Sequence, residues 1–175
     1  MLKGKNVCLR AVEPGDVDFI LQLENDPENW HFGNTLVPFS RFQIEQYALS
    51  SQHNIYTDKQ IRFMIDLIRP ATKNETIGSV DLYDFDPVHK RAGVGILIIA
   101  KERGKGFASE ALDLLIRYCF ELLMLHQIYC DISPENTVSL KLFRNHGFIK
   151  CGIKREWRFK AGKWTDEIMF QLIKP

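Results

Sequence analysis

The stretch Ala92-Gly-Val-Gly-Ile-Leu-Ile-Ile-Ala100 is almost wholly apolar, and Arg103-Gly104-Lys105-Gly106-Phe107-Ala108 follows it closely. An apolar run of this kind is typical of a strand that is covered on both faces. The next residues, 107–123, carry apolar side chains at helical spacing, at Ala108, Leu112, Leu115, Cys119 and Leu122. We therefore predict a buried strand, a glycine-rich loop and an amphipathic helix in direct succession.

The glycine-rich loop is suited to binding an anion. Glycines allow the backbone to turn so that successive N–H groups point into one concavity. The N-terminus of the following helix adds free donors and partial positive charge, and Arg103 and Lys105 add full charges. Its spacing differs from both the nucleoside triphosphate loop and the dinucleotide fingerprint. By itself the loop leaves two interpretations open, an anion cradle or an ordinary turn before a helix.

The regions on either side predict a mixed sheet with helices packed against it. Before the central stretch we expect strands at 7–10, 63–68 and 76–83. We also expect a helix that Asp16 caps and residues 25–29 break, and a second helix at 41–50. After the central stretch we expect strands at 127–132, 148–159 and 165–173 and a helix at 137–146. This order predicts an α/β (mixed α+β) fold with about seven strands and about four helices. No repeat or linker interrupts it, so we expect one domain over residues 1–175.

Composition excludes several classes of protein. The chain has 175 residues, a formal net charge of +1 and 45% apolar residues, as expected of a globular protein with a core. Near-neutrality argues against a nucleic-acid partner, and the apolar runs are too short to cross a membrane. Its four scattered cysteines form no metal-finger pattern. From this cysteine pattern we expect no metal site. Because the N-terminus also lacks the apolar core of a signal peptide, we expect a cytoplasmic protein.

The loop and the chain after it resemble a known family. Arg103-x-x-Gly106-x-Ala108 is similar to the Gln/Arg-x-x-Gly-x-Gly/Ala signature of the GNAT superfamily of N-acetyltransferases. A second segment, Asn136-x-x-Ser139-x-x-Leu142-Phe143-x-x-x-Gly147-Phe148, resembles that family's other acetyl-CoA motif. The segments Leu9–Asp16 and Gly162–Asp166 resemble the branch of ribosomal-protein and spermidine N-acetyltransferases. The resemblance implies a GNAT fold, with a mostly antiparallel sheet that opens in a V-shaped splay.

The resemblance also implies acetyl-CoA as cosubstrate. Its pyrophosphate would lie on backbone N–H groups of Arg103, Gly104, Lys105, Gly106, Phe107 and Ala108. Its pantetheine would pair with Leu97, Ile98 and Ile99 like an added strand, and N–H groups near Ile98 would polarise the acetyl carbonyl. Asn136 would contact the pantetheine, although it is equally suited to capping the helix that follows.

Phe143 departs from the family pattern, because many relatives have a tyrosine there that protonates the leaving thiolate. Phenylalanine cannot donate a proton, and Tyr129 is a candidate substitute. A thiol with a pKa near 8.5 also leaves tolerably as the thiolate, so loss of this acid need not abolish transfer.

Catalysis needs a base, because an alkyl ammonium titrates near 10 and must lose a proton before it attacks. Asp81 and Asp84 are candidates, on or just after strand 76–83. Their spacing places them on opposite faces of a regular strand, so both face the site only if the strand is bulged.

Acidic and aromatic residues between the first two helices are candidates to bind the acceptor. Carboxylates beside an aromatic ring suit a cationic amine; the alternative is a solvated acidic turn with one packed tryptophan. The candidates are Glu24, Asp26, Glu28, Trp30 and His31, together with Asp84, and Trp157 and Trp164 could line the same site.

Charge is divided between the two parts of the chain. Residues 1–100 hold 10 basic and 13 acidic side chains, a net charge of −3, whereas residues 101–175 hold 13 and 9, a net charge of +4. This division suits an enzyme with an anionic donor and a cationic acceptor. The resemblance implies acetyl transfer to a primary amine, and the acidic positions slightly favour a polyamine as the acceptor. The alternatives are a protein N-terminal acetyltransferase and an inactive CoA-binding sensor, and a homo-oligomer is possible.

Overall fold

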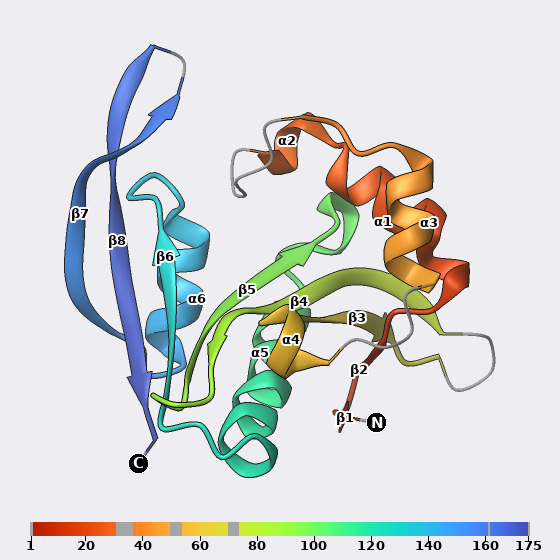
Figure 1. Ribbon diagram of the computed structural model, residues 1–175, viewed down its shortest axis with the longest axis horizontal. Helices are drawn as coiled ribbons and strands as arrows, with labels where there is room; N and C mark the ends of the chain where they lie inside the picture. The colour runs from red at the N-terminus through yellow and green to blue at the C-terminus, as the bar shows by residue number, and fades with distance from the viewer. Residues whose placement is uncertain (1, 31–36, 50–53, 70–73, 161, 175) are drawn as a thin grey trace.

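The computed structural model describes residues 2–30, 37–49, 54–69, 74–160 and 162–174. At its centre is an eight-stranded sheet in the order β1-β2-β3-β4-β5-β6-β8-β7 (Figure 1). The strands are β1 (Leu2–Lys3), β2 (Val7–Ala11), β3 (Ile61–Leu67), β4 (Glu75–Asp86), β5 (Arg91–Ile98), β6 (Gln127–Ile132), β7 (Ile149–Lys160) and β8 (Lys163–Ile173). All neighbours are antiparallel except β5 and β6. The mixed, mostly antiparallel sheet is confirmed, and β1 is the strand that was not predicted.

The described residues form six α-helices, of which four lie close to predicted positions. They are α1 (Val17–Glu24), α2 (Pro27–Trp30), α3 (Arg41–Leu49), α4 (Ile55–Asp58), α5 (Phe107–Arg117) and α6 (Thr137–Asn145), with short turns at Pro14–Asp16 and Ala100–Glu102. The unpredicted α2 forms in the segment 25–29 that was expected to break the first helix. Proline is well tolerated at the first position of a helix. The unpredicted α4 is capped by Asn54, whose side chain accepts a hydrogen bond from the N–H of Tyr56 at 2.9 Å.

The sheet opens between β5 and β6. These strands pair only through Arg91–Gly93 and Gln127–Tyr129, although β5 runs on to Ile98. Over its whole length β6 pairs on its other side with β8. Figure 1 shows the two strands diverging above this short contact. The predicted V-shaped splay is therefore present.

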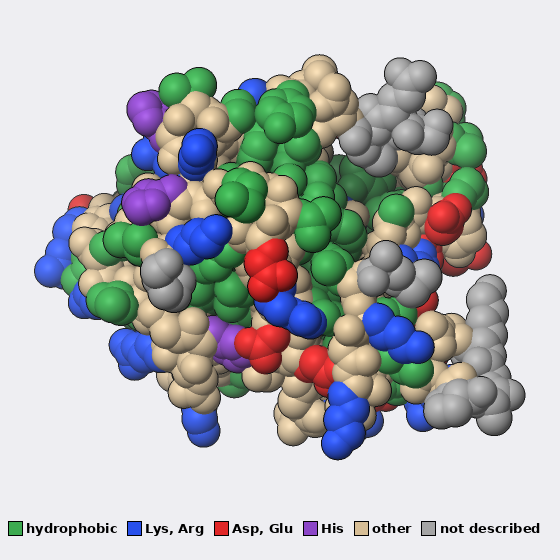
Figure 2. Space-filling view, turned by 90° about the horizontal axis from the view of Figure 1, so that it is seen from below, with side chains coloured by type: hydrophobic (Ala, Val, Ile, Leu, Met, Phe, Trp, Pro, Cys, Tyr) green, Lys and Arg blue, Asp and Glu red, His purple; other side chains and the backbone are tan. Residues whose placement is uncertain are grey.

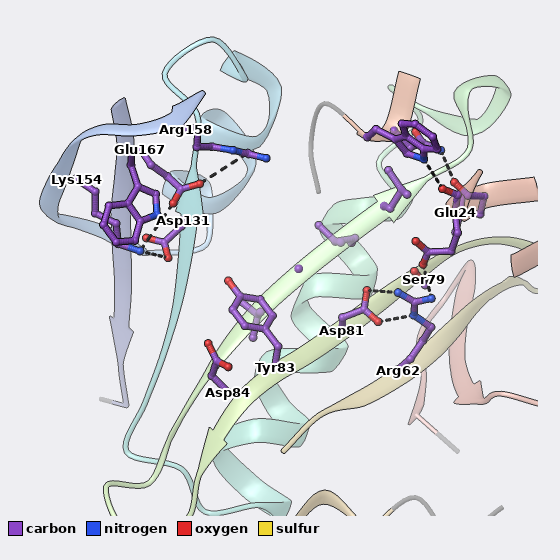
Figure 3. Close-up of a pocket in the computed structure, with 18 residues that line it drawn as sticks. Glu24, Arg62, Ser79, Asp81, Tyr83, Asp84, Asp131, Lys154, Arg158 and Glu167 are labelled. Carbon is purple, nitrogen blue, oxygen red and sulfur yellow. Dashed lines mark hydrogen bonds and ion pairs between the residues drawn. The ribbon is translucent and has the colours of Figure 1, made fainter. Parts of the chain in front are cut away.

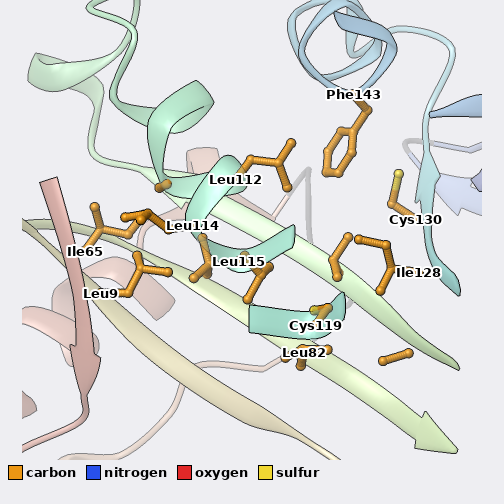
Figure 4. Packing of buried hydrophobic residues seen from close by; sticks show 14 of the residues in the cluster. Leu9, Ile65, Leu82, Leu112, Leu114, Leu115, Cys119, Ile128, Cys130 and Phe143 are labelled. Atoms are coloured by element: carbon orange, nitrogen blue, oxygen red, sulfur yellow. The ribbon is translucent and has the colours of Figure 1, made fainter. Parts of the chain in front are cut away.

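The larger of the two hydrophobic clusters among the described residues lies between α5, α6 and both halves of the sheet (Figure 4). Leu112 and Leu115 of α5 are at most 1% exposed and belong to the same cluster as Ile65 and Ile128. The predicted apolar face of this helix does not include Leu122, whose side chain is 68% exposed. A π-helical turn over Tyr118–Leu122 continues α5, and its wider pitch moves later side chains out of phase with this face.

No helix among the described residues has both the length and the apolar character that crossing a bilayer requires. On the face shown in Figure 2, basic and acidic side chains are interspersed with apolar ones.

Candidate active site

A cavity of about 610 Å³ lies at the opening between β5 and β6. The backbone of β5 forms its floor, and α1, α2, β3 and β4 form one wall. The opposite wall comes from β6, β7 and β8 (Figure 3). Its charged lining consists of Glu24, Arg62, Asp81, Asp84, Asp131, Lys154, Arg158 and Glu167. Five carboxylates thus face three basic groups, an excess that suits a cationic ligand.

Arg62 holds two of these carboxylates on the first wall. Its Nε lies 2.6 Å from Asp81 Oδ1, and its Nη1 lies 2.5 Å from Glu24 Oε1. Burial by itself would lower the pKa of Arg62, yet Asp81 and Glu24 raise it above its ordinary value. Asp81 and Glu24 therefore face the cavity as members of an ion-pair network (Figure 3).

Asp84 reaches the same cavity because β4 is irregular. The register with β5 shifts between Tyr83 and Asp86, and Asp84 has a φ of 49°. Aspartate adopts this left-handed region more readily than most residues. As a result Asp81 and Asp84 both line the cavity, the arrangement that sequence spacing allowed only with a bulge.

Tyr129 approaches Asp84 from β6. Its hydroxyl donates a hydrogen bond to Asp84 Oδ2 at 3.3 Å. Burial, together with the charge of Asp84 and this hydrogen bond, raises the pKa of Tyr129 to about 12. Tyr129 therefore keeps its proton at neutral pH and directs it toward Asp84.

A second charged group lies on the opposite wall. Lys154 Nζ is 2.6 Å from Asp131 Oδ2 and 3.8 Å from Glu167 Oε2, and Arg158 Nη1 is 3.7 Å from Glu167 Oε1. The other oxygen of Asp131, Oδ1, is buried and has no hydrogen-bond partner among the described residues. Burial, with the nearby charge of Asp131, raises the pKa of Glu167. The spare acceptor on this wall is therefore Asp131 Oδ1, which no described residue hydrogen-bonds.

The loop before α5 has the geometry of an anion cradle. Gly104 and Gly106 have φ values of 76° and 86°, in the left-handed region that favours glycine. A Cβ added to either would meet no atom within 4 Å, so the loop surface is open. The first N–H groups of α5 have no carbonyl one turn before them. The residues present therefore fit the pyrophosphate of CoA.

The two basic side chains of this loop, Arg103 and Lys105, are paired with other groups of the protein. Arg103 Nε donates to the Ile98 carbonyl at 2.8 Å, and its Nη2 donates to Asn29 Oδ1 at 3.0 Å. Lys105 pairs with Glu102 at 3.0 Å. Because these cations have protein partners, the anion-binding capacity of the loop lies mainly in its backbone.

The backbone of β5 exposes hydrogen-bonding groups to the opening. The N–H of Ile99 donates to the Ile77 carbonyl of β4 at 2.9 Å. Because an antiparallel strand alternates its bonding side, the N–H groups of Ile96 and Ile98 point away from β4. Leu97 lines the cavity with its side chain. The edge around Leu97, Ile98 and Ile99 therefore has room for an extended ligand chain.

The second acetyl-CoA motif lies on α6. Asn136 is the N-cap, and its side chain accepts a hydrogen bond from the N–H of Ser139 at 3.1 Å. The cap uses only the side-chain oxygen of Asn136, and the side-chain NH₂ takes no part in it. Phe143 is only 3% exposed and packs edge-on against Phe148, with ring centroids 5.0 Å apart. The ring of Phe143 is therefore a core side chain.

A thiol route through Cys130 is unfavourable. Cys130 is 2% exposed, and burial, followed by the charge of Asp131, raises the pKa of its thiol well above the usual range. A buried neutral thiol is a poor nucleophile.

The predicted acceptor residues are only partly brought together. Glu24 and Trp30 line the cavity, and the Trp30 indole N–H donates to the Glu24 carbonyl at 2.6 Å. Glu28 is exposed on α2 and is absent from the described cavity lining. Trp157 lines the cavity, whereas Trp164 packs on Phe159 in the β7–β8 hairpin. His31 falls outside the described residues.

Sequence reasoning missed Arg62, Asp131, Lys154, Arg158 and Glu167. One signal was available, because Ile128, Cys130 and Ile132 alternate as buried residues. Tyr129 and Asp131 must then share the other face of β6. The remaining residues meet through strand pairings that spacing does not reveal.

Comparison with known proteins defines the class to which this fold and site belong. A family model described as "Acetyltransferase (GNAT) domain" matches residues 6–149. A spermidine N(1)-acetyltransferase of Vibrio cholerae is 32% identical over 165 residues, which are 93% of this chain and 90% of the relative. An uncharacterised N-acetyltransferase, p20, of Bacillus licheniformis is 31% identical over 99% of this chain and 96% of its own length.

Solved structures agree with this class. The spermidine N-acetyltransferase of Vibrio cholerae in complex with CoA and spermine has a TM-score of 0.84 and 28% identity. The match covers 97% of this chain and 96% of that one. The architecture, and a loop that fits the pyrophosphate of CoA, agree with an acyl-CoA-dependent transferase. The chain belongs to the GNAT acetyltransferase family, and it is an N-acetyltransferase that uses acetyl-CoA.

Proposed function

We propose that this N-acetyltransferase acetylates a primary amine of a linear polyamine. The observation that carries the proposal is the excess of carboxylates around the cavity at the splayed strands, five against three basic groups. A polyamine carries several positive charges at neutral pH and so gains from such a lining. The activities of the relatives point to the same class of acceptor, since spermidine acetyltransferases are among them.

Asp84 is the group that we assign as base. It lies in the cavity on a bulged part of β4, and among the described residues no cation forms an ion pair with it. Asp81, by contrast, is engaged through both oxygens by Arg62, at 2.6 and 3.3 Å. Asp84 thus takes the ammonium proton, directly or through water, so that the nitrogen lone pair becomes free.

Tyr129 orients that base rather than protonating the leaving group. Its hydroxyl proton is directed to Asp84, and a pKa of about 12 makes it a weak acid. Acetyl-CoA supplies a thioester whose acetyl group passes to the amine nitrogen while the C–S bond breaks. Because the thiol titrates near 8.5, it leaves as the thiolate without an acid in the place of Phe143.

The wall formed by β6, β7 and β8 then holds the distal part of the acceptor. Asp131 has a buried oxygen that lacks a partner in the described part of the chain, and Glu167 lies beside it. Trp157 lines the same wall and adds an aromatic face for a cation. A polyamine spans two walls, whereas a short monoamine reaches only one.

A thiol-release assay with matched amines tests this function. With acetyl-CoA in excess, we expect kcat/KM for spermidine to exceed that for butylamine by at least about tenfold, as an added ion pair in a partly buried site allows. Butylamine is the control, because it has the same reacting group with no distal charge. Preference for a peptide N-terminus would instead establish a protein acetyltransferase. CoA binding without turnover of any amine would establish a sensor and overturn the proposal.

A further inference from the structure

Arg103 and Asn29 join two parts of the site that are far apart in the chain. Arg103 begins the CoA-binding loop at the end of β5, and Asn29 lies on α2, 74 residues earlier. The guanidinium donates to the Ile98 carbonyl at 2.8 Å and to Asn29 Oδ1 at 3.0 Å. Figure 1 shows α2 on the same side of the molecule as the end of β5. One side chain thus links the donor loop to the wall of the acceptor cavity.

Three polar groups of Asn29, its backbone N–H, Nδ2 and Oδ1, each form a hydrogen bond. Its backbone N–H donates to the Asp26 carbonyl at 2.9 Å, and its Nδ2 donates to the Leu23 carbonyl at 3.0 Å. Its Oδ1 accepts from Arg103. Asn29 is only 7% exposed. Removing the guanidinium would leave a buried amide oxygen without this partner, which is costly enough to move the segment.

The segment that would move carries part of the cavity. Asn29 and Trp30 both line it, and α2 has only four residues, from Pro27 to Trp30. A helix of this length has little stability of its own and depends on tertiary contacts. The position of Trp30 in the cavity wall therefore depends on the bonds that Asn29 makes.

We propose that Arg103 and Asn29 are a pair of positioning residues that couple the CoA-binding loop to the acceptor wall. The guanidinium of Arg103 serves the acceptor side, and the loop backbone serves the phosphates. Binding of CoA to the loop then orders α2 and improves the site for the amine. The identity of the amine rests on the proposed function above, but the coupling does not.

Steady-state kinetics separates this role from phosphate binding. In Arg103→Met and in Asn29→Leu we expect KM for spermidine to rise about tenfold, the effect of losing the hydrogen bond that both variants remove. The Kd for CoA, measured by calorimetry, should change by less than about twofold, because the backbone cradle remains. A loss of CoA affinity as large as the rise in KM would show that the guanidinium binds phosphate, and would overturn the proposal.

Two further variants sharpen this test. Lys101→Met removes a charge beside the same loop, but Lys101 pairs with exposed Glu75 at 2.7 Å. We expect both constants to stay within about twofold in this control, since exposed ion pairs contribute little. The losses in the double variant Arg103→Met/Asn29→Leu should be smaller than the sum of the two single losses, because both single variants already remove the shared contact. Fully additive losses would mean that they act independently.

Hydrogen exchange tests the coupling without any acceptor. In the wild-type chain, CoA should slow amide exchange in a peptide covering residues 23–30, and this protection should disappear in Arg103→Met. Equal protection in both proteins would contradict the coupling. If the wild type turned over no amine, the proposed function would fail while this measurement still decided the further inference.

Discussion

At the scale of single residues, Asp84 shows how one backbone angle decides which side chains reach a site. Regular alternation along β4 would send Asp81 and Asp84 to opposite faces. The φ of 49° at Asp84 and the register shift beside it bring both to the cavity. Arg62 then distinguishes the two carboxylates, because it pairs with Asp81. The pair could be predicted from the sequence, but not the difference between its members.

Asp84→Asn tests the assignment of the base. Asparagine also adopts the left-handed region, so the bulge should persist. We expect kcat/KM for the amine to fall more at pH 7 than at pH 9. The reason is that an amine titrating near 10 is about a hundred times more deprotonated at the higher pH and needs the base less.

Tyr129→Phe serves as the matched variant in the same pH series. It leaves the carboxylate in place and removes only the hydrogen bond of 3.3 Å. Its loss should be smaller than that of Asp84→Asn at pH 7. An equal loss at both pH values in Asp84→Asn would argue against proton transfer to Asp84.

At the scale of elements, the loop before α5 has the conformation that its glycines predicted. Gly106 is the N-cap of α5 and has a φ of 86°. The conformation is local, so the sequence revealed it. The partners of Arg103 and Lys105 are not visible in the sequence, and those partners changed the expected role of both side chains.

Gly106→Leu should abolish detectable CoA binding and leave the fold intact. A side chain there would occupy the open surface of the cradle, and the positive φ would lower stability by about 1–2 kcal/mol. Gly162→Leu is the matched control, because Gly162 has a φ of 77° and equally open surroundings in the β7–β8 turn. Calorimetry with CoA and thermal unfolding should give similar losses of stability but loss of binding only in Gly106→Leu. Unchanged CoA affinity in Gly106→Leu would mean that the cradle lies elsewhere.

At the scale of the whole molecule, the sheet is split at the site but the core is continuous. A single cluster includes Leu9 of β2, Leu115 of α5 and Phe170 of β8. The cavity opens where β5 and β6 separate, and the core joins both halves of the sheet. We therefore infer that residues 1–175 fold as one cooperative domain.

Leu115→Ala tests this cooperativity. Leu115 is fully buried, and such truncations lower the free energy of unfolding by about 2–5 kcal/mol. In urea, tryptophan fluorescence and far-ultraviolet circular dichroism should report one coincident transition before and after the change. Trp30 lies on one side of the splay and Trp157 on the other. Transitions that separate between the two probes would indicate two independently folding halves.

The division of charge along the chain predicted that acidic groups of the cavity would come from residues 1–100, but the fold takes them from both segments. The acidic segment 1–100 supplies Glu24, Asp81 and Asp84 to the cavity. Asp131 and Glu167 come from the basic segment 101–175. The carboxylates that line the cavity therefore come from both segments.

The strand, the glycine loop and the helix around Gly106 follow from local pattern alone, because hydrophobic period and left-handed glycines act over a few residues. The sequence also determined the order of the larger elements and, through its motifs, the family. The ion pair between Arg62 and Asp81 and the hydrogen bond from Arg103 to Asn29 are visible only in the folded chain. Those contacts depend on strand register and on the splay of the sheet. Both arise from packing between distant segments, which no local pattern encodes.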